Sequence, residues 1–207
     1  MYLFNFIATF SVLFPFIAGN MIKKSYKNNS LNFIITQFAT VYVDAYIWAE
    51  IFAWKFHNNI PIYTLLNLVE LVLFSLFVTK LLQSKRAHFI IFVTITILFG
   101  EYIFRKNVWE FYSFFFNVKC LAIIGTSFSV IYYLIKNQSI NKKILLTLFF
   151  ILSILFYNLC TFYIYLFLDH LLLKQNKSII ELLISITLTV EILRNASWLL
   201  ILKKYGN

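Results

Sequence analysis

Apolar residues along this chain gather into runs of about twenty, separated by short polar stretches. An α-helix rises about 1.5 Å per residue, so each run is long enough to cross the roughly 30 Å hydrocarbon core of a bilayer. The short connections predict one compact bundle, a single domain over residues 1–207. The pattern predicts an all-α, polytopic membrane protein of seven transmembrane helices, at Tyr2–Ile22, Asn32–Trp54, Ile62–Leu82, His88–Phe104, Val108–Ile135, Ile144–Asp169 and Ser178–Leu202.

The composition supports this class. The chain is 61% hydrophobic and 13% charged, whereas a soluble domain is about 45–50% apolar and about 25% charged. Its 4 Gly and 2 Pro leave the predicted helices largely uninterrupted, and we expect a kink at Pro15. Cys120 and Cys160 both fall within apolar runs, so they indicate neither a disulfide framework nor a Cys-rich metal site.

The basic residues lie mainly on one side of the predicted bundle. The loops after the first, third and fifth segments, with the carboxyl-terminal tail, hold eleven Lys and Arg, and the other loops hold five. Because cytoplasmic loops carry the excess of Lys and Arg, we expect the N-terminus outside and the C-terminus inside a bacterial cytoplasmic (inner) membrane. The net charge of +10 then predicts a basic inner face that binds anionic lipid headgroups or a cytoplasmic protein.

Ionisable side chains also fall inside the segments. A charge at the bilayer centre costs at least about 2.5–3.5 kcal/mol, so such residues are candidate functional residues. Helical rise places three acids and two bases near the midplane, which leaves one carboxylate to keep a proton or bind a cation. The midplane group is Asp44, Glu70, Glu191, Lys119 and Arg194, with Glu50 in the outer third of its segment.

Polar residues recur at helical spacing in four segments, and we expect these stripes to turn inward. They suggest a polar, acidic cavity open to the outer side, with Lys119 as its basic anchor. The alternative is that the stripes only join the helices, since polar contacts between membrane helices contribute about 0.6 kcal/mol on average. The candidate ligand-binding or ion-pair residues are Asp44, Glu50, Asn67, Glu70, Lys119, Asn158, Glu191 and Arg194.

Several sharper chemistries fit the residues poorly. A retinal-binding lysine would be Lys119, but microbial rhodopsins carry theirs in the seventh span, where this chain has Arg194. A metal hydrolase needs clustered ligands, and the three histidines are isolated at segment ends. Carriers typically show internal repeats and broken helices at the site, and neither is found here. We therefore expect no metal, no cofactor and no enzymatic nucleophile.

A short set of residues carries a family resemblance: Glu50, the pair Asn58-Asn59, Tyr63 and Glu70. In these positions the chain resembles a group of small, uncharacterised bacterial seven-span membrane proteins. The resemblance covers most of the chain by span pattern and those few residues by identity, and it implies a fold but no catalysis. In size and span count the chain is also similar to small accessory membrane proteins of phage-defence and CRISPR loci.

These observations favour a non-enzymatic membrane sensor or binding module for a small or ionic ligand that enters from outside. Asp44, Glu50, Glu70 and Lys119 would form the pocket, and Glu191 with Arg194 a two-state ion pair that ligand binding could bias. The alternative is an oligomeric pore or an accessory subunit of a larger system, with the same charges lining a path or a subunit interface. A homo-oligomer is compatible with either hypothesis.

Overall fold

The computed structural model describes residues 2–22, 30–82, 89, 92–94, 96–97, 100, 113–137, 141–173 and 177–206. Within these residues the chain forms seven helices and no strand, which confirms the all-helical prediction. Six of the seven predicted segments coincide with these helices, and the predicted span His88–Phe104 lies largely outside the described residues. The helices are α1 (Tyr2–Ser11), α2 (Leu13–Ile22), α3 (Ser30–Phe56), α4 (Ile60–Leu82), α6 (Ser113–Asn137), α7 (Lys142–Leu173) and α8 (Lys177–Gly206).

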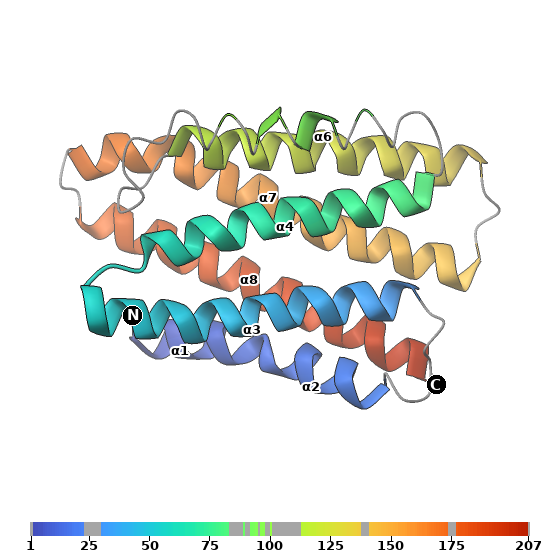
Figure 1. The fold of residues 1–207 in the computed structure, drawn as a ribbon, viewed down its shortest axis with the longest axis horizontal. Helices are drawn as coiled ribbons and strands as arrows, with labels where there is room; N and C mark the ends of the chain where they lie inside the picture. The colour runs from blue at the N-terminus through green and yellow to red at the C-terminus, as the bar shows by residue number, and fades with distance from the viewer. Residues whose placement is uncertain are drawn as a thin grey trace.

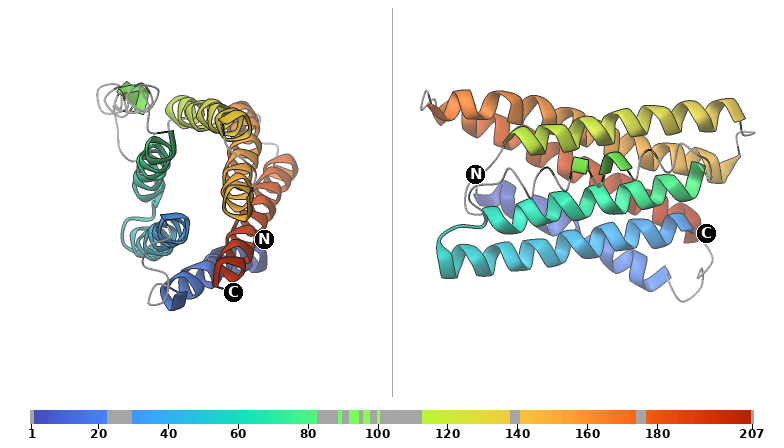
Figure 2. Two further views of the ribbon diagram at one scale, coloured as in Figure 1. Left: turned by 90° about the vertical axis from the view of Figure 1, so that its right-hand side faces the viewer. Right: turned by 45° about the horizontal axis from the view of Figure 1, so that its top comes forward.

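The helices stand side by side in one ring (Figures 1 and 2). Going round it, α2 packs against α3, α3 against α4, α4 against α6, α6 against α7 and α7 against α8. Helix α8 then closes the ring by packing against α1 and α2. Neighbours joined by a short connection (α2 and α3, α3 and α4, α6 and α7, α7 and α8) run in opposite directions. The pair α4 and α6 runs in one direction, as does α8 with α1 and α2 (Figure 1). The two ends of the ring therefore carry different loops.

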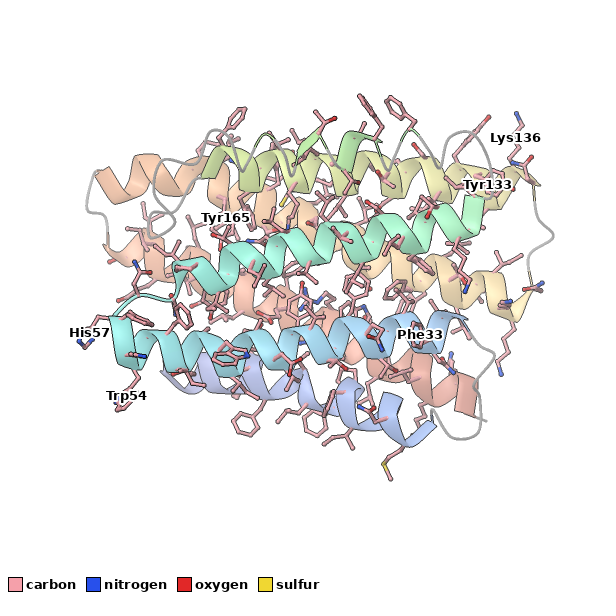
Figure 3. The ribbon with its side chains drawn as sticks, in the orientation of Figure 1. Phe33, Trp54, His57, Tyr133, Lys136 and Tyr165 are labelled. Atoms are coloured by element: carbon pink, nitrogen blue, oxygen red, sulfur yellow. The ribbon has the colours of Figure 1, made fainter. Side chains whose placement is uncertain are left out.

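We call these ends the turn end and the lysine end. The turn end holds residues 57–59, which join α3 to α4, and the lysine end holds the carboxyl terminus. Figure 3 shows His57 at the first and Lys136 at the second. Exposed lysines gather at the lysine end: Lys80, Lys136, Lys142, Lys143, Lys203 and Lys204.

The first predicted span is divided into two ten-residue helices, with Val12 between them. Pro15 explains the break. Its nitrogen carries no hydrogen to donate to the Ser11 carbonyl four residues earlier, and its ring crowds that carbonyl. The chain resumes with a hydrogen bond from the Phe16 N–H to the Val12 carbonyl at 3.2 Å. The expected interruption of this span is therefore present, at the turn of helix before Pro15.

The connection between α3 and α4 is tight. His57 has a φ of 54°, the left-handed conformation that commonly ends a helix. The Asn58 side-chain oxygen accepts a hydrogen bond from the Ile60 N–H at 2.9 Å and so caps the start of α4. Pro61 follows in the first turn, where no backbone donor is needed. The turn between these two helices therefore occupies residues 57–59, in the gap between the predicted segments Asn32–Trp54 and Ile62–Leu82.

In the described part of the chain, three helical segments are long and apolar enough to cross a membrane, judged by length and composition: Ile60–Leu82, Phe116–Asn137 and Lys142–Phe167. Helices α3 and α8 reach 27 and 30 residues and carry more polar positions. Large apolar side chains also cover the outside of the ring. They include Phe14, Leu65, Leu76, Phe128, Leu145, Leu152, Leu182, Leu193 and Leu200, each at least 48% exposed.

The buried core in the lysine half of the ring is aromatic. The Trp198 ring of α8 lies 5.7 Å from Phe38 of α3 and 5.8 Å from Phe150 of α7, between ring centroids. Phe77 of α4 meets Phe150 edge-on at 5.3 Å. We call these four rings the aromatic floor. Because they come from α3, α4, α7 and α8, they fill the middle of the ring.

Helix α2 approaches α3 closely at Gly19. A Cβ atom placed on Gly19 would lie 3.0 Å from Thr36 Cβ and 3.1 Å from Thr36 Cγ2, and Thr36 is 4% exposed. We expect Gly19→Ala to lower the free energy of unfolding by about 1–3 kcal/mol, the usual cost of overpacking. Gly125→Ala is the matched control, since a Cβ there has no atom within 4 Å. Equal thermal unfolding of the two variants in detergent would contradict this packing.

Candidate functional site

A cavity of about 550 Å³ lies inside the ring, in the half that ends at the turn end. Ligand pockets commonly measure about 300–1,000 Å³. Figure 3 shows Tyr165, one of the lining residues, in the half that contains His57, away from Tyr133 and Lys136. We call this cavity the tyrosine pocket. Its polar lining comes from five helices and from the turn between α3 and α4. It is made by Thr9, Tyr42, Tyr46, Glu50, Asn59, Tyr63, Thr64, Asn67, Tyr157, Tyr165, Thr187 and Glu191.

An ion pair lies directly beneath the pocket, between α4 and α6. Lys119 Nζ is 2.8 Å from Glu70 Oε2, and each side chain is 3% exposed. The same nitrogen donates to Asn67 Oδ1 at 3.1 Å and lies 4.6 Å from the centre of the Phe116 ring. Asn67 and Phe116 both line the pocket. A buried ion pair therefore supports the pocket wall, and two lining residues, Asn67 and Phe116, hold the Lys119 ammonium group in place.

A second buried cation, Arg194 of α8, is held by aromatic rings. Its guanidinium carbon lies 4.1 Å from the ring centres of both Tyr42 and Tyr157 and 4.9 Å from that of Trp198. Nη1 donates to the Tyr42 hydroxyl at 2.7 Å. Tyr42 and Tyr157 line the pocket, while Trp198 belongs to the aromatic floor. Arg194 thus lies between the pocket and the floor and joins them.

Glu191 completes this layer of charges. Its Oε1 atom is 3.6 Å from Arg194 Nη2, one helical turn away, and accepts a hydrogen bond from the Tyr46 hydroxyl. Each pair is neutral: Lys119 balances the charge of Glu70, and Arg194 balances that of Glu191.

Glu50 leaves the pocket with surplus negative charge. Its side chain is exposed and lines the pocket. The described lining contains two acids, Glu50 and Glu191, and neither Lys, Arg nor His. Since Glu191 already faces Arg194, Glu50 supplies a carboxylate to whatever enters.

Asp44 is the candidate residue that the structure does not bring to the site. Its side chain is exposed, and it is absent from the described lining. Asp44 follows Tyr42 by two residues, about 200° around the helix, so the burial of Tyr42 turns Asp44 outward. The sequence pattern predicted that the polar stripe of Gln37, Thr40, Asp44 and Trp48 would turn inward. This is wrong for Asp44 and Trp48, which are exposed, Trp48 by 54%.

The remaining candidates occupy different levels. Glu50, Asn67 and Glu191 line the pocket, and Glu70, Lys119 and Arg194 lie beneath it. Asn158 of α7 is fully buried and outside the described lining; its Nδ2 donates to the Ile154 carbonyl at 3.0 Å. Its Oδ1 has no hydrogen-bond partner among the described residues.

Sequence reasoning missed the tyrosines around Arg194. Tyr42, Tyr46 and Glu50 recur at intervals of four residues, which places them on one side of α3. That spacing was available from the sequence. The pairing of Tyr42 with Tyr157 across Arg194 was not, because it depends on how α3, α7 and α8 meet.

In the described part of the chain, no three His, Cys, Asp or Glu side chains lie close enough together to hold a metal ion. Comparison with protein-family models, characterised proteins and solved structures gives no match to this chain. The family resemblance noted from the sequence therefore stays a prediction.

Proposed function

We propose that this chain is a non-enzymatic, seven-span integral membrane protein that binds a small organic cation in the tyrosine pocket. The single observation that carries the proposal is the lining itself. Five tyrosines share the lining with Glu50, a carboxylate that no described basic residue neutralises, in a cavity of ligand size. Proteins recognise quaternary ammonium groups with aromatic rings, and a nearby carboxylate attracts the same positive charge.

The outside of the ring supports membrane embedding. Soluble monomers rarely expose contiguous apolar patches of more than a few hundred Å². Here Phe, Leu and Ile side chains point outward on every described helix from α2 to α8, which suits contact with lipid tails. Three of the helices also have the length and composition to cross a bilayer.

The lysine end suits the cytoplasmic side. Six exposed lysines gather there, and cytoplasmic segments are the ones enriched in basic residues. The turn end, with the pocket, then faces outward. In this orientation the lysine end would contact anionic headgroups or a cytoplasmic protein, and a ligand would enter from outside a bacterial cytoplasmic membrane.

The chemistry of the lining favours a cation over an anion. An anion in the pocket would be repelled by Glu50, and the two nearby cations already have carboxylate partners. The lining also includes Ile60, Leu66, Ile164, Ile184 and Leu188. The pocket therefore suits an ammonium group attached to an apolar body.

The aromatic floor favours a pocket over a pore. A conduction path would have to continue from the tyrosine pocket to the lysine end through the middle of the ring. Phe38, Phe150 and Trp198 fill that region and are each at most 1% exposed. The pocket is thus closed at the bottom by packed rings, which suits a ligand that enters and leaves by one end.

Glu50→Gln should weaken the binding of choline at least about tenfold, because it removes the carboxylate that neutralises the ammonium group; tenfold corresponds to about 1.4 kcal/mol. Binding is measured by isothermal titration of the full-length protein in lipid nanodiscs. The wild type should bind the uncharged isostere 3,3-dimethyl-1-butanol more weakly than choline. The wild type and Glu50→Gln should bind this isostere equally.

Asp44→Asn is the matched control for Glu50→Gln, since it makes the same change of charge on the outer side of the same helix. Its affinity for choline should equal that of the wild type. The proposal is overturned if choline and its isostere bind alike, or if the Glu50 and Asp44 variants lose affinity equally. A thermal unfolding midpoint unchanged in both variants shows that neither result comes from misfolding.

A further inference from the structure

The outward side of α3 carries a carboxylate among large apolar side chains. We call it the Asp44 face: Phe33, Thr40, Ile47, Trp48 and Ile51 each lie within about 60° of Asp44 around the helix. Phe33, Ile47 and Trp48 are each at least 54% exposed. Asp44 is exposed too and has neither a hydrogen bond nor an ion pair within the described chain.

Asp44 lies at the middle of its helix. It is fourteen residues after Ser30 and twelve before Phe56, which places it about 21 Å and about 18 Å from the two ends. If α3 spans the membrane as proposed, the carboxylate faces the hydrocarbon centre. Acidic residues at that depth almost always pair with another polar group or line a watery path.

The surroundings of Asp44 exclude a watery path. Its neighbours on the face are Ile47, Trp48 and Ile51, and the tyrosine pocket opens on the other side of the helix. Thr40 is occupied by its own helix, because its hydroxyl donates to the Thr36 carbonyl at 2.8 Å. The carboxylate therefore needs a partner that the described chain does not supply.

A second copy of this chain fits poorly as that partner. The two basic residues at mid-depth, Lys119 and Arg194, are 2% exposed and already paired inside the ring. The described lysines with exposed side chains lie near the helix ends. A symmetric dimer through this face would place carboxylate against carboxylate.

We propose that the Asp44 face docks a membrane-spanning helix of a different protein, which carries a lysine or arginine at mid-depth opposite Asp44. The partner base would neutralise the carboxylate, and its apolar residues would cover Ile47, Trp48 and Ile51. This inference rests on α3 spanning the membrane. It does not depend on any ligand of the tyrosine pocket.

The test is photo-crosslinking of the full-length protein in the membranes of its own cells, with p-benzoylphenylalanine in place of Trp48. We expect one main protein adduct whose cross-linked peptide is an apolar segment with a central Lys or Arg. Phe128 of α6, which is 56% exposed, is the control position, where lipid adducts are expected. Asp44→Asn should reduce the Trp48 adduct at least about tenfold.

Exchange of the charges makes the test decisive. Asp44→Lys should abolish the adduct, and changing the partner's central base to Asp in the same cells should restore it. Adducts only to lipid or to a second copy of the chain would overturn the proposal. So would a partner segment without a base, or an adduct that Asp44→Asn leaves unchanged. Equal thermal unfolding of the purified Asp44→Asn and wild-type proteins would show that the fold is intact.

Discussion

Lys119→Met should lower the free energy of unfolding by about 3–5 kcal/mol, the usual cost of removing one partner of a buried ion pair. The Glu70 carboxylate would keep its place in the ring with no cation of the described residues within 4 Å, although it is 3% exposed. Methionine nearly preserves the length and volume of the lysine chain, so loss of charge and hydrogen bonds, not loss of packing, dominates. The measurement is SDS-induced unfolding in mixed micelles, followed by circular dichroism.

The double variant Lys119→Met, Glu70→Gln is the control. Removing both charges avoids the uncompensated carboxylate, and replacement of a whole buried pair is often close to neutral. We expect the double variant to recover most of the stability that the single variant loses. A single variant as stable as the wild type, or a double variant no better than the single one, would show that the pair does not support the pocket.

Arg194→Met should also lower the free energy of unfolding by about 3–5 kcal/mol, because it leaves Glu191 buried without its cation. Arg194→Lys separates charge from shape. Lysine keeps the positive charge but cannot stack a flat guanidinium between Tyr42 and Tyr157. Because desolvated cation–aromatic contacts contribute about 2 kcal/mol, we expect Arg194→Lys to cost about 2 kcal/mol in the same unfolding measurement.

The comparison of the two Arg194 variants tests the role of the rings. If Arg194→Lys unfolds like the wild type, charge alone holds α8 in place and the tyrosine sandwich contributes nothing. If it unfolds like Arg194→Met, the flat geometry is decisive, and the binding of Tyr42 and Tyr157 to Arg194 orders the pocket wall. The expected intermediate value requires both contributions.

The positions of the helices could be read from the sequence. The predicted segment Ile62–Leu82 ends at the same residue as α4 and begins two residues after the first residue of α4, Ile60. Long apolar runs leave little choice of structure, because backbone groups in an apolar setting must be hydrogen-bonded within the helix. The depth of Glu70 and Lys119 followed from the same helical rise, and the structure pairs them.

The inward side of α3 could not be read in the same way. Lipid tails are as apolar as a protein core, so the outward face of a membrane helix need not be polar, and apolar periodicity does not identify the buried face. The stripe containing Asp44 was expected to turn inward because it holds polar residues at helical spacing. The buried stripe is instead formed by Phe38, Tyr42, Ala45 and Ala49, whose rings and small side chains pack against the neighbouring helices.

The contacts of Arg194 depend on the packing of three helices. Sequence spacing indicated that Glu191 and Arg194 share a face, and the two lie 3.6 Å apart. It did not indicate the rings of Tyr42, Tyr157 and Trp198, since these come from α3, α7 and α8 and meet only when the ring closes. Long-range contacts between side chains require the ring of helices, which local pattern does not specify.

The proposal that the tyrosine pocket binds an organic cation is tested most directly by native mass spectrometry. The protein is released from its own membranes in mild detergent. We expect each copy of the chain to carry one extra mass, that of a small amine or ammonium compound. Glu50→Gln should lose this mass, and Asp44→Asn should keep it. A wild-type chain without bound small molecule, found in a closed oligomer, would contradict the binding proposal and favour an oligomeric pore.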